Sequence, residues 1–222
     1  MGEKFIITID GPGGAGKSTI GKILAKKLDY VYLDTGALYR ALAYKALKEK
    51  ILIDDPASLA TLCRHTEVVL KNNRGHLNVY VDGEDVERKI RTEEVGLAAS
   101  KISTFPVVRE KLLDLQRQAG IQGGIIAEGR DMGSVVFPGA DYKFYLDASV
   151  EERTRRRHQE LLQKNSVAEY ESIKKDMQAR DRQDSQREIA PLKAPEGSVM
   201  IDSDHLSIEE VVEKIISTIS IK

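Results

Sequence analysis

The sequence predicts an α/β protein with a P-loop-type, doubly wound, five-stranded parallel sheet and helices on both faces. Three observations support this fold class. Buried-strand patterns alternate with helical patterns, a glycine-rich loop joins the first strand to the first helix, and polar residues follow the strand ends. Parallel strands joined through helices require right-handed crossovers, which place helices on both faces. We also expect a small antiparallel β insert and a helical, arginine-rich lid.

Each expected core strand is a short apolar run that stops at polar residues. The first run, Phe5-Ile6-Ile7-Thr8-Ile9, stops at Asp10, and the third stops at Glu128. Because ligands of such sheets bind beyond the carboxyl ends of the strands, these polar residues are the ones to inspect for a site. In chain order the five runs cover residues 5–9, 30–33, 124–127, 142–147 and 199–202.

Helical patterns follow these strands, and a hairpin interrupts the alternation. Ser149 with Glu152, and Ser207 with Glu210, have the spacing of capping boxes, so a helix is expected to start at each serine. The expected helices cover about 20–28, 36–50, 92–103, 107–119, a stretch from 149, 167–183 and 207–219. The antiparallel insert is predicted from strands at 67–70 and 76–81, separated by a polar loop at 71–75.

The glycine-rich loop fits the pattern G-x-x-x-x-G-K-[ST] of a P-loop. In a strand-loop-helix context, successive backbone N–H groups and the positive end of the helix converge on one spot. Lys17 adds a mobile cation there, and the hydroxyl of Ser18 can bind Mg²⁺. The loop therefore predicts a triphosphate site with the metal ligand Ser18, formed by Gly11, Gly13, Gly14, Ala15, Gly16, Lys17, Ser18 and Thr19.

Arginines near the strand ends predict a second anion beside the triphosphate. Arg40 lies one helical turn beyond Thr35, and Arg130 follows the third strand, so both should face the same crevice. Guanidinium groups pair with phosphate oxygens and could hold two phosphoryl groups in line during transfer. An acceptor that is itself a phosphate is already ionised near neutral pH and needs no general base.

Two further charged stretches leave alternatives open. The arginine run at 153–157 is either a solvated helix face or part of a lid over the phosphates. Arg180, Asp184 and Arg187 have the spacing of one helical face, which suits a surface ion-pair ladder as well as a lid. A lid has a physical reason to carry arginines, because closure excludes water and strengthens their hold on the transferring group.

Composition limits the class of protein and its partners. The 222 residues, with 41% hydrophobic and 31% charged, suit one globular domain. A net charge of −1 argues against a general binder of nucleic acid or membrane. Cys63 is the single cysteine, so there is no disulfide framework, and we find no secretory leader or membrane-spanning run. We expect a monomer in the cytoplasm.

Sequence blocks along almost the whole chain resemble the bacterial cytidylate kinases. The glycine loop alone marks only a P-loop enzyme, whereas the blocks at 33–40, 105–109 and 128–138 are specific to this family. Thr35 stands where serine is common, which keeps the hydroxyl, and Glu128 stands where aspartate is common. The resembling blocks are 7–19, 33–40, 91–95 with 98–100, 105–109, 128–138, 180–187 and 206–211.

The resemblance implies transfer of the γ-phosphoryl group of ATP to CMP or dCMP, with Mg²⁺. By matching position, Ser100, Arg109 and Asp131 would bind the cytosine, and Arg180 and Asp184 the pentose. Arg40, Arg130 and Arg187 would hold the acceptor phosphate, with Thr35 also in the CMP site. The resemblance favours the functional interpretation of 180–187, and the residues it implies for catalysis are Lys17, Arg130 and Arg187.

The same resemblance implies a division of one domain, 1–222, into three parts. The parts are a core of about 1–35, 121–150 and 190–222, an acceptor-binding part of about 36–120 that holds the hairpin, and a lid of about 151–189. Two rival classes are a different P-loop small-molecule kinase and a nucleotide-dependent switch. The switch is disfavoured because the chain has no Asn-Lys-x-Asp guanine-recognition motif.

Overall fold

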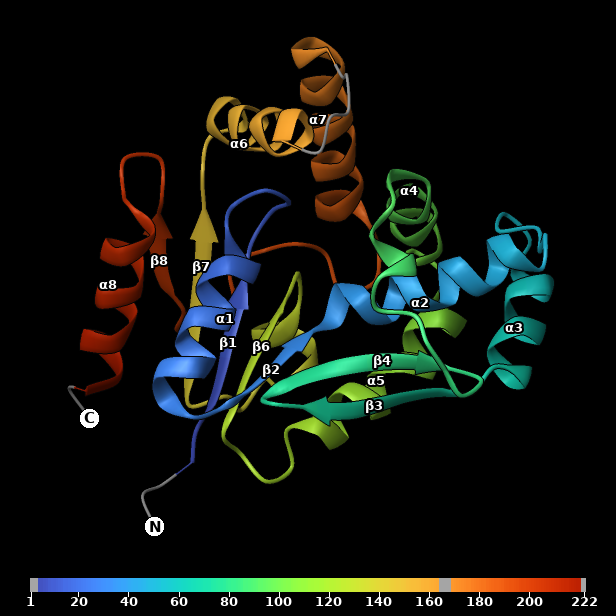
Figure 1. The fold of residues 1–222 in the computed structure, drawn as a ribbon, viewed down its shortest axis with the longest axis horizontal. Coiled ribbons are helices and arrows are strands. Elements are labelled where there is room, and N and C mark those ends of the chain that lie inside the picture. Colours follow the sequence, from blue (N-terminus) through green and yellow to red (C-terminus); the bar gives the residue numbers. More distant parts are fainter. Residues whose placement is uncertain (1–3, 164–168, 221–222) are drawn as a thin grey trace.

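The computed structural model describes residues 4–163 and 169–220, shown in Figure 1. Its central sheet has the strand order β3-β4-β2-β6-β1-β7-β8, with β5 paired to β4. The five strands from β2 to β8 in this order are all parallel to their neighbours. They are β1 Ile6–Asp10, β2 Val31–Asp34, β6 Ile125–Gly129, β7 Tyr142–Asp147 and β8 Val199–Asp202. The predicted parallel sheet is confirmed.

Helices cover both faces of this sheet, as predicted. Helices α1 (Lys17–Leu28) and α8 (Ile208–Ser220) pack on one face, where Phe144 and Ile9 are fully buried. Helix α5 (Pro106–Ala119) and the π-helical turn η2 (Met132–Val136) cover the other face. The apolar stripe of α8 provides Val211, Val212 and Ile215 to the core, which is why the sequence pattern identified this helix.

The antiparallel insert extends the sheet on one edge. Strands β3 (Val68–Asn73) and β4 (His76–Val81) form the hairpin, with β5 (Glu84–Asp85) beside β4. The predicted loop at 71–75 is wrong, because the turn needs only two residues. Arg74 and Gly75 have φ values of 52° and 83°, the left-handed backbone that tight hairpins require.

The remaining helices of the first half pack around a second hydrophobic cluster, to which α5 and β4 also contribute. They are α2 (Thr35–Lys48), α3 (Pro56–His65), η1 (Lys89–Arg91) and α4 (Glu93–Ile102). Helix α3 was absent from the sequence prediction. Its start has a recognisable signal, since Asp55 accepts hydrogen bonds from Ala57 N and Ser58 N, and Pro56 occupies the first helical position.

Helices α6 (Val150–Gln163) and α7 (Tyr170–Gln186) pack against each other beyond the carboxyl ends of β1 and β7 (Figure 1). The predicted start of the second helix near Val167 lies outside the described residues. Helix α7 ends at Gln186, so the prediction that Arg187 shares a helix with Arg180 and Asp184 is wrong. Among the described residues, no helix has the length and apolar character needed to cross a membrane.

Candidate active site

The P-loop lies between β1 and α1 and is held by close backbone packing. Gly11 has φ of 146°, and a Cβ atom there would lie 2.0 Å from the carbonyl oxygen of Leu146. Gly14 has φ of 82°, and a Cβ atom there would lie 2.8 Å from Met177 Cε in α7. Any side chain at either position would displace a neighbour, so these two glycines bring the loop backbone close to β7 and to α7.

Lys17 and Ser18 occupy the first turn of α1, as the motif predicts. Lys17 is only 5% exposed, and its Nζ donates to Pro12 O at 2.6 Å. Burial, followed by the charge of Arg130, lowers the pKa of Lys17 to about 7. Ser18 Oγ donates to Glu128 Oε1 at 2.5 Å, and the hydroxyl of buried Tyr32 donates to the same oxygen.

A cluster of arginines lies beside the P-loop. Arg130 Nε donates to Asp184 Oδ2 at 2.8 Å, and a Cβ atom on Gly13 would lie 3.3 Å from Arg130 Nη2. Burial and the charges of Arg130 and Arg40 lower the pKa of Arg180 to about 10, although Asp184 opposes this. These positive charges therefore lie close enough to repel one another.

Two half-buried arginines keep a buried N–H group without a hydrogen-bond acceptor in the described part of the chain. Arg180 Nε and Arg187 Nη2 are buried and have no hydrogen-bond partner among the described residues. Arg187 Nη2 lies 3.8 Å from Asp131 Oδ1, and Arg187 Nη1 lies 3.9 Å from Asp184 Oδ1. Buried N–H groups cost free energy unless they are paired, so this arrangement favours an anionic ligand that accepts from them.

Asp34 and Thr35 fix the start of α2 in front of this cluster. Asp34 Oδ1 accepts from Ala37 N at 3.0 Å, and Oδ2 lies 2.7 Å from Arg91 Nη1 and 3.4 Å from Arg40 Nη1. Burial alone would raise the pKa of Asp34, but the two arginines lower it to about 2. Thr35 Oγ1 donates to Glu128 O at 2.7 Å, which ties α2 to β6. Arg91 was not among the predicted site residues.

The three residues expected to bind a base are brought to one region. Arg109 forms a buried ion pair with Asp131, donates to Ser103 O at 3.3 Å, and lies 5.6 Å from the centre of the Tyr39 ring. Ser100 lies in the last turn of α4, three residues before Ser103. Its carbonyl oxygen accepts from Gln183 Nε2 of α7 at 2.7 Å.

Asp10 positions the segment that carries Asp131. Its carboxylate accepts from Met132 N at 2.7 Å and from Gly133 N at 2.8 Å, at the start of the π-helical turn. Asp10 is fully buried, and burial raises its pKa to about 6. The end of β1 therefore orients both the P-loop and the Asp131 segment.

The sequence left open whether the arginine run at 153–157 is a solvated helix face or part of a lid, and its members differ in this respect. Arg153 is buried and donates to Gly13 O of the P-loop at 3.1 Å, while its Nη2 pairs with Asp181 Oδ2 at 2.7 Å. Arg156 Nη2 donates to Ser203 O at 2.7 Å. Arg155, in contrast, is exposed and pairs with Glu152 of its own helix. Arg153 thus faces the P-loop, and Arg155 faces solvent.

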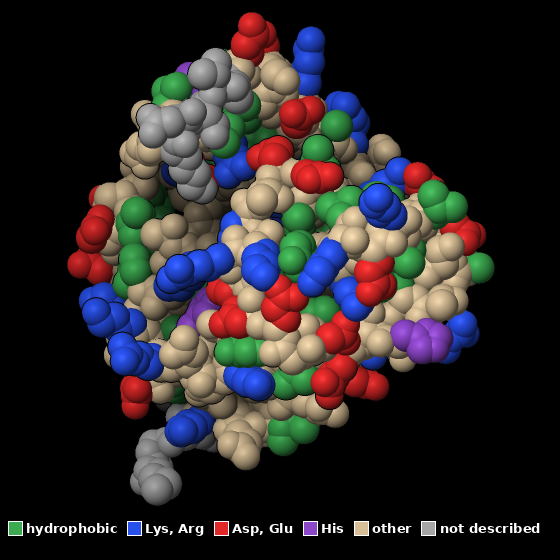
Figure 2. Space-filling model, turned by 45° about the vertical axis from the view of Figure 1, so that its right-hand side comes forward, with side chains coloured by type: hydrophobic (Ala, Val, Ile, Leu, Met, Phe, Trp, Pro, Cys, Tyr) green, Lys and Arg blue, Asp and Glu red, His purple; other side chains and the backbone are tan. Residues whose placement is uncertain are grey.

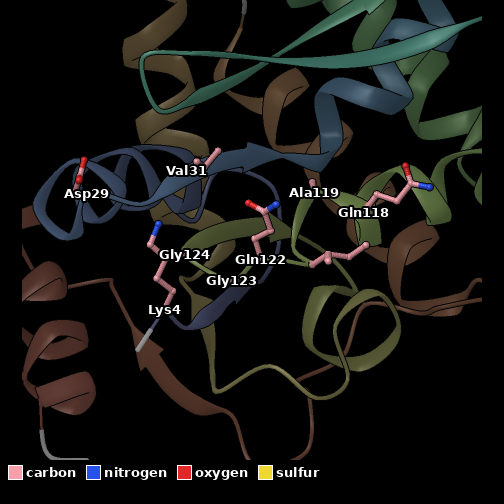
Figure 3. Close-up of a pocket in the computed structure, with 9 residues that line it drawn as sticks. Lys4, Asp29, Val31, Gln118, Ala119, Gln122, Gly123 and Gly124 are labelled. Atoms are coloured by element: carbon pink, nitrogen blue, oxygen red, sulfur yellow. The ribbon is translucent and has the colours of Figure 1, made fainter. Parts of the chain in front are cut away.

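A separate cavity lies at the opposite ends of the strands (Figure 3). Lys4, Asp29 and Gln122 line it together with Gly123 and Gly124, just before β6 begins. It includes neither the P-loop nor any of the clustered arginines, so we do not assign it to the candidate site.

The parallel sheet and the glycine loop between β1 and α1 define an α/β protein of the P-loop type. A solved shikimate kinase from Bacteroides thetaiotaomicron has the same fold, with a TM-score of 0.51, 13% identity, and coverage of 98% of this chain and 99% of that one. The family model for cytidylate kinase matches residues 7–221. The chain belongs to the cytidylate kinase family.

Curated relatives agree with this assignment over most of their length. A cytidylate kinase of a Geobacillus species is 47% identical over 220 residues, which cover 99% of this chain and 98% of the relative. A cytidylate kinase of a Geobacter species is 50% identical over 208 residues, which cover 94% and 89%. The family resemblance inferred from the sequence blocks is confirmed.

Proposed function

We propose that the protein transfers the γ-phosphoryl group of ATP to CMP or dCMP, giving ADP and CDP or dCDP. The observation that carries the proposal is the cluster of half-buried arginines beside the P-loop, in which Arg180 Nε and Arg187 Nη2 are buried without a hydrogen-bond acceptor among the described residues. A donor needs one phosphate-binding element, and a second cationic cluster beside it fits an acceptor that carries its own anionic group, such as a phosphate. Family membership supports the same reaction.

The donor half comprises residues 11–19, whose loop N–H groups and Lys17 would bind the phosphates of ATP. The oxygen atoms of Ser18 and Glu128 suit Mg²⁺, a cation that prefers oxygen ligands and keeps several waters when phosphates complete its shell. When bound, the metal neutralises charge on the transferring phosphoryl group. Tyr32 and Ser18 both donate to Glu128, which holds this carboxylate in place beside the loop.

ATP binding is expected to take up a proton at Lys17 when the pH is above 7. Its pKa of about 7 leaves the free amine mostly neutral at pH 8 and mostly charged at pH 6, and a bound triphosphate favours the charged form. Calorimetry in buffers of different ionisation enthalpy should give an uptake approaching about one proton per ATP at pH 8, and much less at pH 6. The variant Lys17→Met should lose this uptake. Equal uptake in the variant would assign the proton to another group.

The acceptor half would use the remaining arginines. Arg40, Arg130 and Arg187 would bind the CMP phosphate, and Arg180 with Asp184 the pentose. Asp131 can accept from the exocyclic amine of cytosine, while Ser100 and Arg109 donate to its carbonyl oxygen and ring nitrogen. Uracil presents a carbonyl in place of the amine, so it would face the carboxylate with the wrong polarity.

In the proposed reaction the acceptor phosphate needs no general base. An ionised acceptor phosphate can attack once it lies in line with the γ-phosphoryl group. Arg130 contacts Asp184 on α7 and lies close to the P-loop, so it is placed to bridge donor and acceptor phosphates. We assign the catalytic roles to Lys17, Arg130 and Arg187.

The three-part division predicted from the sequence belongs to this proposal. We propose that residues 36–120 bind the acceptor and that α6 and α7 form the lid, with Arg153 carrying lid contacts to the P-loop. Figure 2 shows acidic and basic side chains intermixed over one face of the molecule, which suits small-molecule nucleotides better than nucleic acid as partners. We further propose a monomer in the cytoplasm, where a buried lone thiol such as Cys63 stays reduced.

An acceptor panel tests the reaction class. With ATP and Mg²⁺, production of ADP is measured separately with CMP, dCMP, UMP, AMP and shikimate. CMP and dCMP are expected to give the highest kcat/KM, with CDP and dCDP as products. A higher kcat/KM with any other acceptor would overturn the proposal. GTP preference without acceptor turnover would instead favour a nucleotide switch.

A further inference from the structure

Gln183 joins α7 to the last turn of α4 across the candidate site. Its Nε2 donates to Ser100 O at 2.7 Å and to Ser100 Oγ at 3.1 Å. The carbonyl of Ser100 can only accept a hydrogen bond, so the amide nitrogen of Gln183, not its oxygen, must face this residue. The orientation of the Gln183 side chain follows from this chemistry.

The Ser100 carbonyl is one of the carbonyls at the end of α4 that lack an intrahelical N–H partner. The neighbouring carbonyls of Ala99, Lys101 and Ile102 accept backbone bonds from residues 103–105, whereas that of Ser100 accepts from Ser103 Oγ at 2.7 Å and from Gln183. Gln183 therefore acts as a C-terminal cap of α4, supplied from a helix that lies more than 80 residues further along the chain.

The second hydrogen bond determines what the Ser100 hydroxyl can do. A hydroxyl group has one proton and two lone pairs. When Gln183 donates to the oxygen of Ser100, the hydroxyl proton remains free to be donated to a third group. The hydroxyl is thereby prepared as a donor to the cytosine ring, the role that the proposed function gives it.

A second contact joins α4 to the helix pair α6 and α7. Arg157 Nη2 of α6 lies 2.5 Å from Glu93 Oε2 at the first residue of α4. Glu93 is largely exposed, so this pair contributes little by itself. Helix α4 is nevertheless contacted at both ends by the two helices α6 and α7.

We propose that Gln183 is a positioning residue for base specificity: it sets Ser100 as a hydrogen-bond donor to cytosine and joins the proposed lid helix α7 to the site of the acceptor base. The inference rests on the proposed function, because it requires Ser100 to contact the base. Gln183 itself touches Ser100 and acts only through it.

The test compares substitutions at Gln183 with the same substitutions at Gln186, an exposed glutamine at the end of the same helix. Gln183→Met keeps the length and removes the donor of both hydrogen bonds to Ser100. We expect the preference for CMP over UMP to fall about 10-fold through a higher KM for CMP, with KM for ATP unchanged, the effect of one hydrogen bond lost between Ser100 and the base. Gln183→Glu should lower the preference for CMP over UMP further, because a carboxylate would draw the Ser100 proton to itself. Gln186→Met and Gln186→Glu should behave as the parent chain.

The variant Ser100→Ala separates the role of Gln183 from the base-binding role of Ser100. In the Ser100→Ala background, Gln183→Met should change the CMP to UMP preference less than about 2-fold. A loss as large as in the parent background, or a Gln183→Met variant that matches Gln186→Met, would overturn the role of Gln183 alone. A Ser100→Ala variant with unchanged preference would overturn this inference and the base-binding role of Ser100. A parent chain without preference for CMP would overturn the proposed function as well.

Discussion

Asp131→Asn is expected to reduce the preference for CMP over UMP by about 100-fold or more, with KM for ATP changed less than about 2-fold. The carboxylate accepts from the cytosine amine, whereas an asparagine amide can rotate to donate to the uracil carbonyl as well. The measurement is kcat/KM for both acceptors at saturating ATP. Asp131 is 3% exposed and closely packed, and asparagine is chosen because it has nearly the same shape as aspartate.

The Asp131 substitution also weakens a buried ion pair, and its effect on stability must be separated from its effect on recognition. Arg109 pairs with Asp131 directly, and Arg187 lies 3.8 Å away, so both lose a negative partner. A thermal unfolding curve without substrate measures that loss. Unchanged discrimination against UMP in a variant that is still folded would remove the base-recognition role from Asp131.

Arg130→Met is expected to lower kcat with CMP about 1000-fold, the magnitude typical of an arginine that stabilises phosphoryl transfer. Arg130 lies beside Gly13 of the P-loop, in the proposed ATP site, and pairs with Asp184, in the proposed CMP site. Its guanidinium group therefore lies between the two proposed nucleotide sites. Arg130→Lys should restore little activity, because an ammonium group cannot pair with two phosphate oxygens in the planar geometry of a guanidinium. Single-turnover rates with bound ATP and CMP measure the chemical step.

The matched control is Arg155→Met in the neighbouring helix α6. Arg155 is exposed and bonds only to Glu152 and Gln159 among the described residues, so its loss should leave kcat within about 2-fold. If kcat fell equally in Arg130→Met and Arg155→Met, the cause would be the change in net charge. That result would contradict the catalytic assignment of Arg130.

Much of the fold could be predicted because local patterns agree with tertiary structure. The β1-loop-α1 unit combines a buried strand, glycines and an amphipathic helix, and each signal is local. Helix α3 has only 10 residues, so the start signal at Asp55 is followed by few turns of apolar pattern. The π-helical turn after Asp131 depends on Asp10, more than 100 residues earlier, so no local pattern could have shown it.

Site residues that belong to a sequence motif could be predicted, whereas residues whose role depends only on a tertiary contact could not. Lys17, Ser18 and the arginines follow strand ends or known blocks, and the structure brings them together. Arg91 and Gln183 lie in the resembling blocks 91–95 and 180–187, but the blocks give neither residue a role, because each acts on a residue distant in sequence, Asp34 and Ser100. The position of Arg187 beyond the end of α7 was missed because helical spacing does not show where a helix stops.

The central claim is a two-nucleotide site that distinguishes cytosine from uracil, and a competition reaction tests it most directly. CMP and UMP at equal concentration, with ATP and Mg²⁺ in one tube, compete for the same enzyme, so the initial ratio of CDP to UDP equals the ratio of their kcat/KM values. We predict CDP in excess by about 100-fold or more. Comparable amounts of both diphosphates, or an excess of UDP, would contradict the assignment of Ser100, Arg109 and Asp131 to the base.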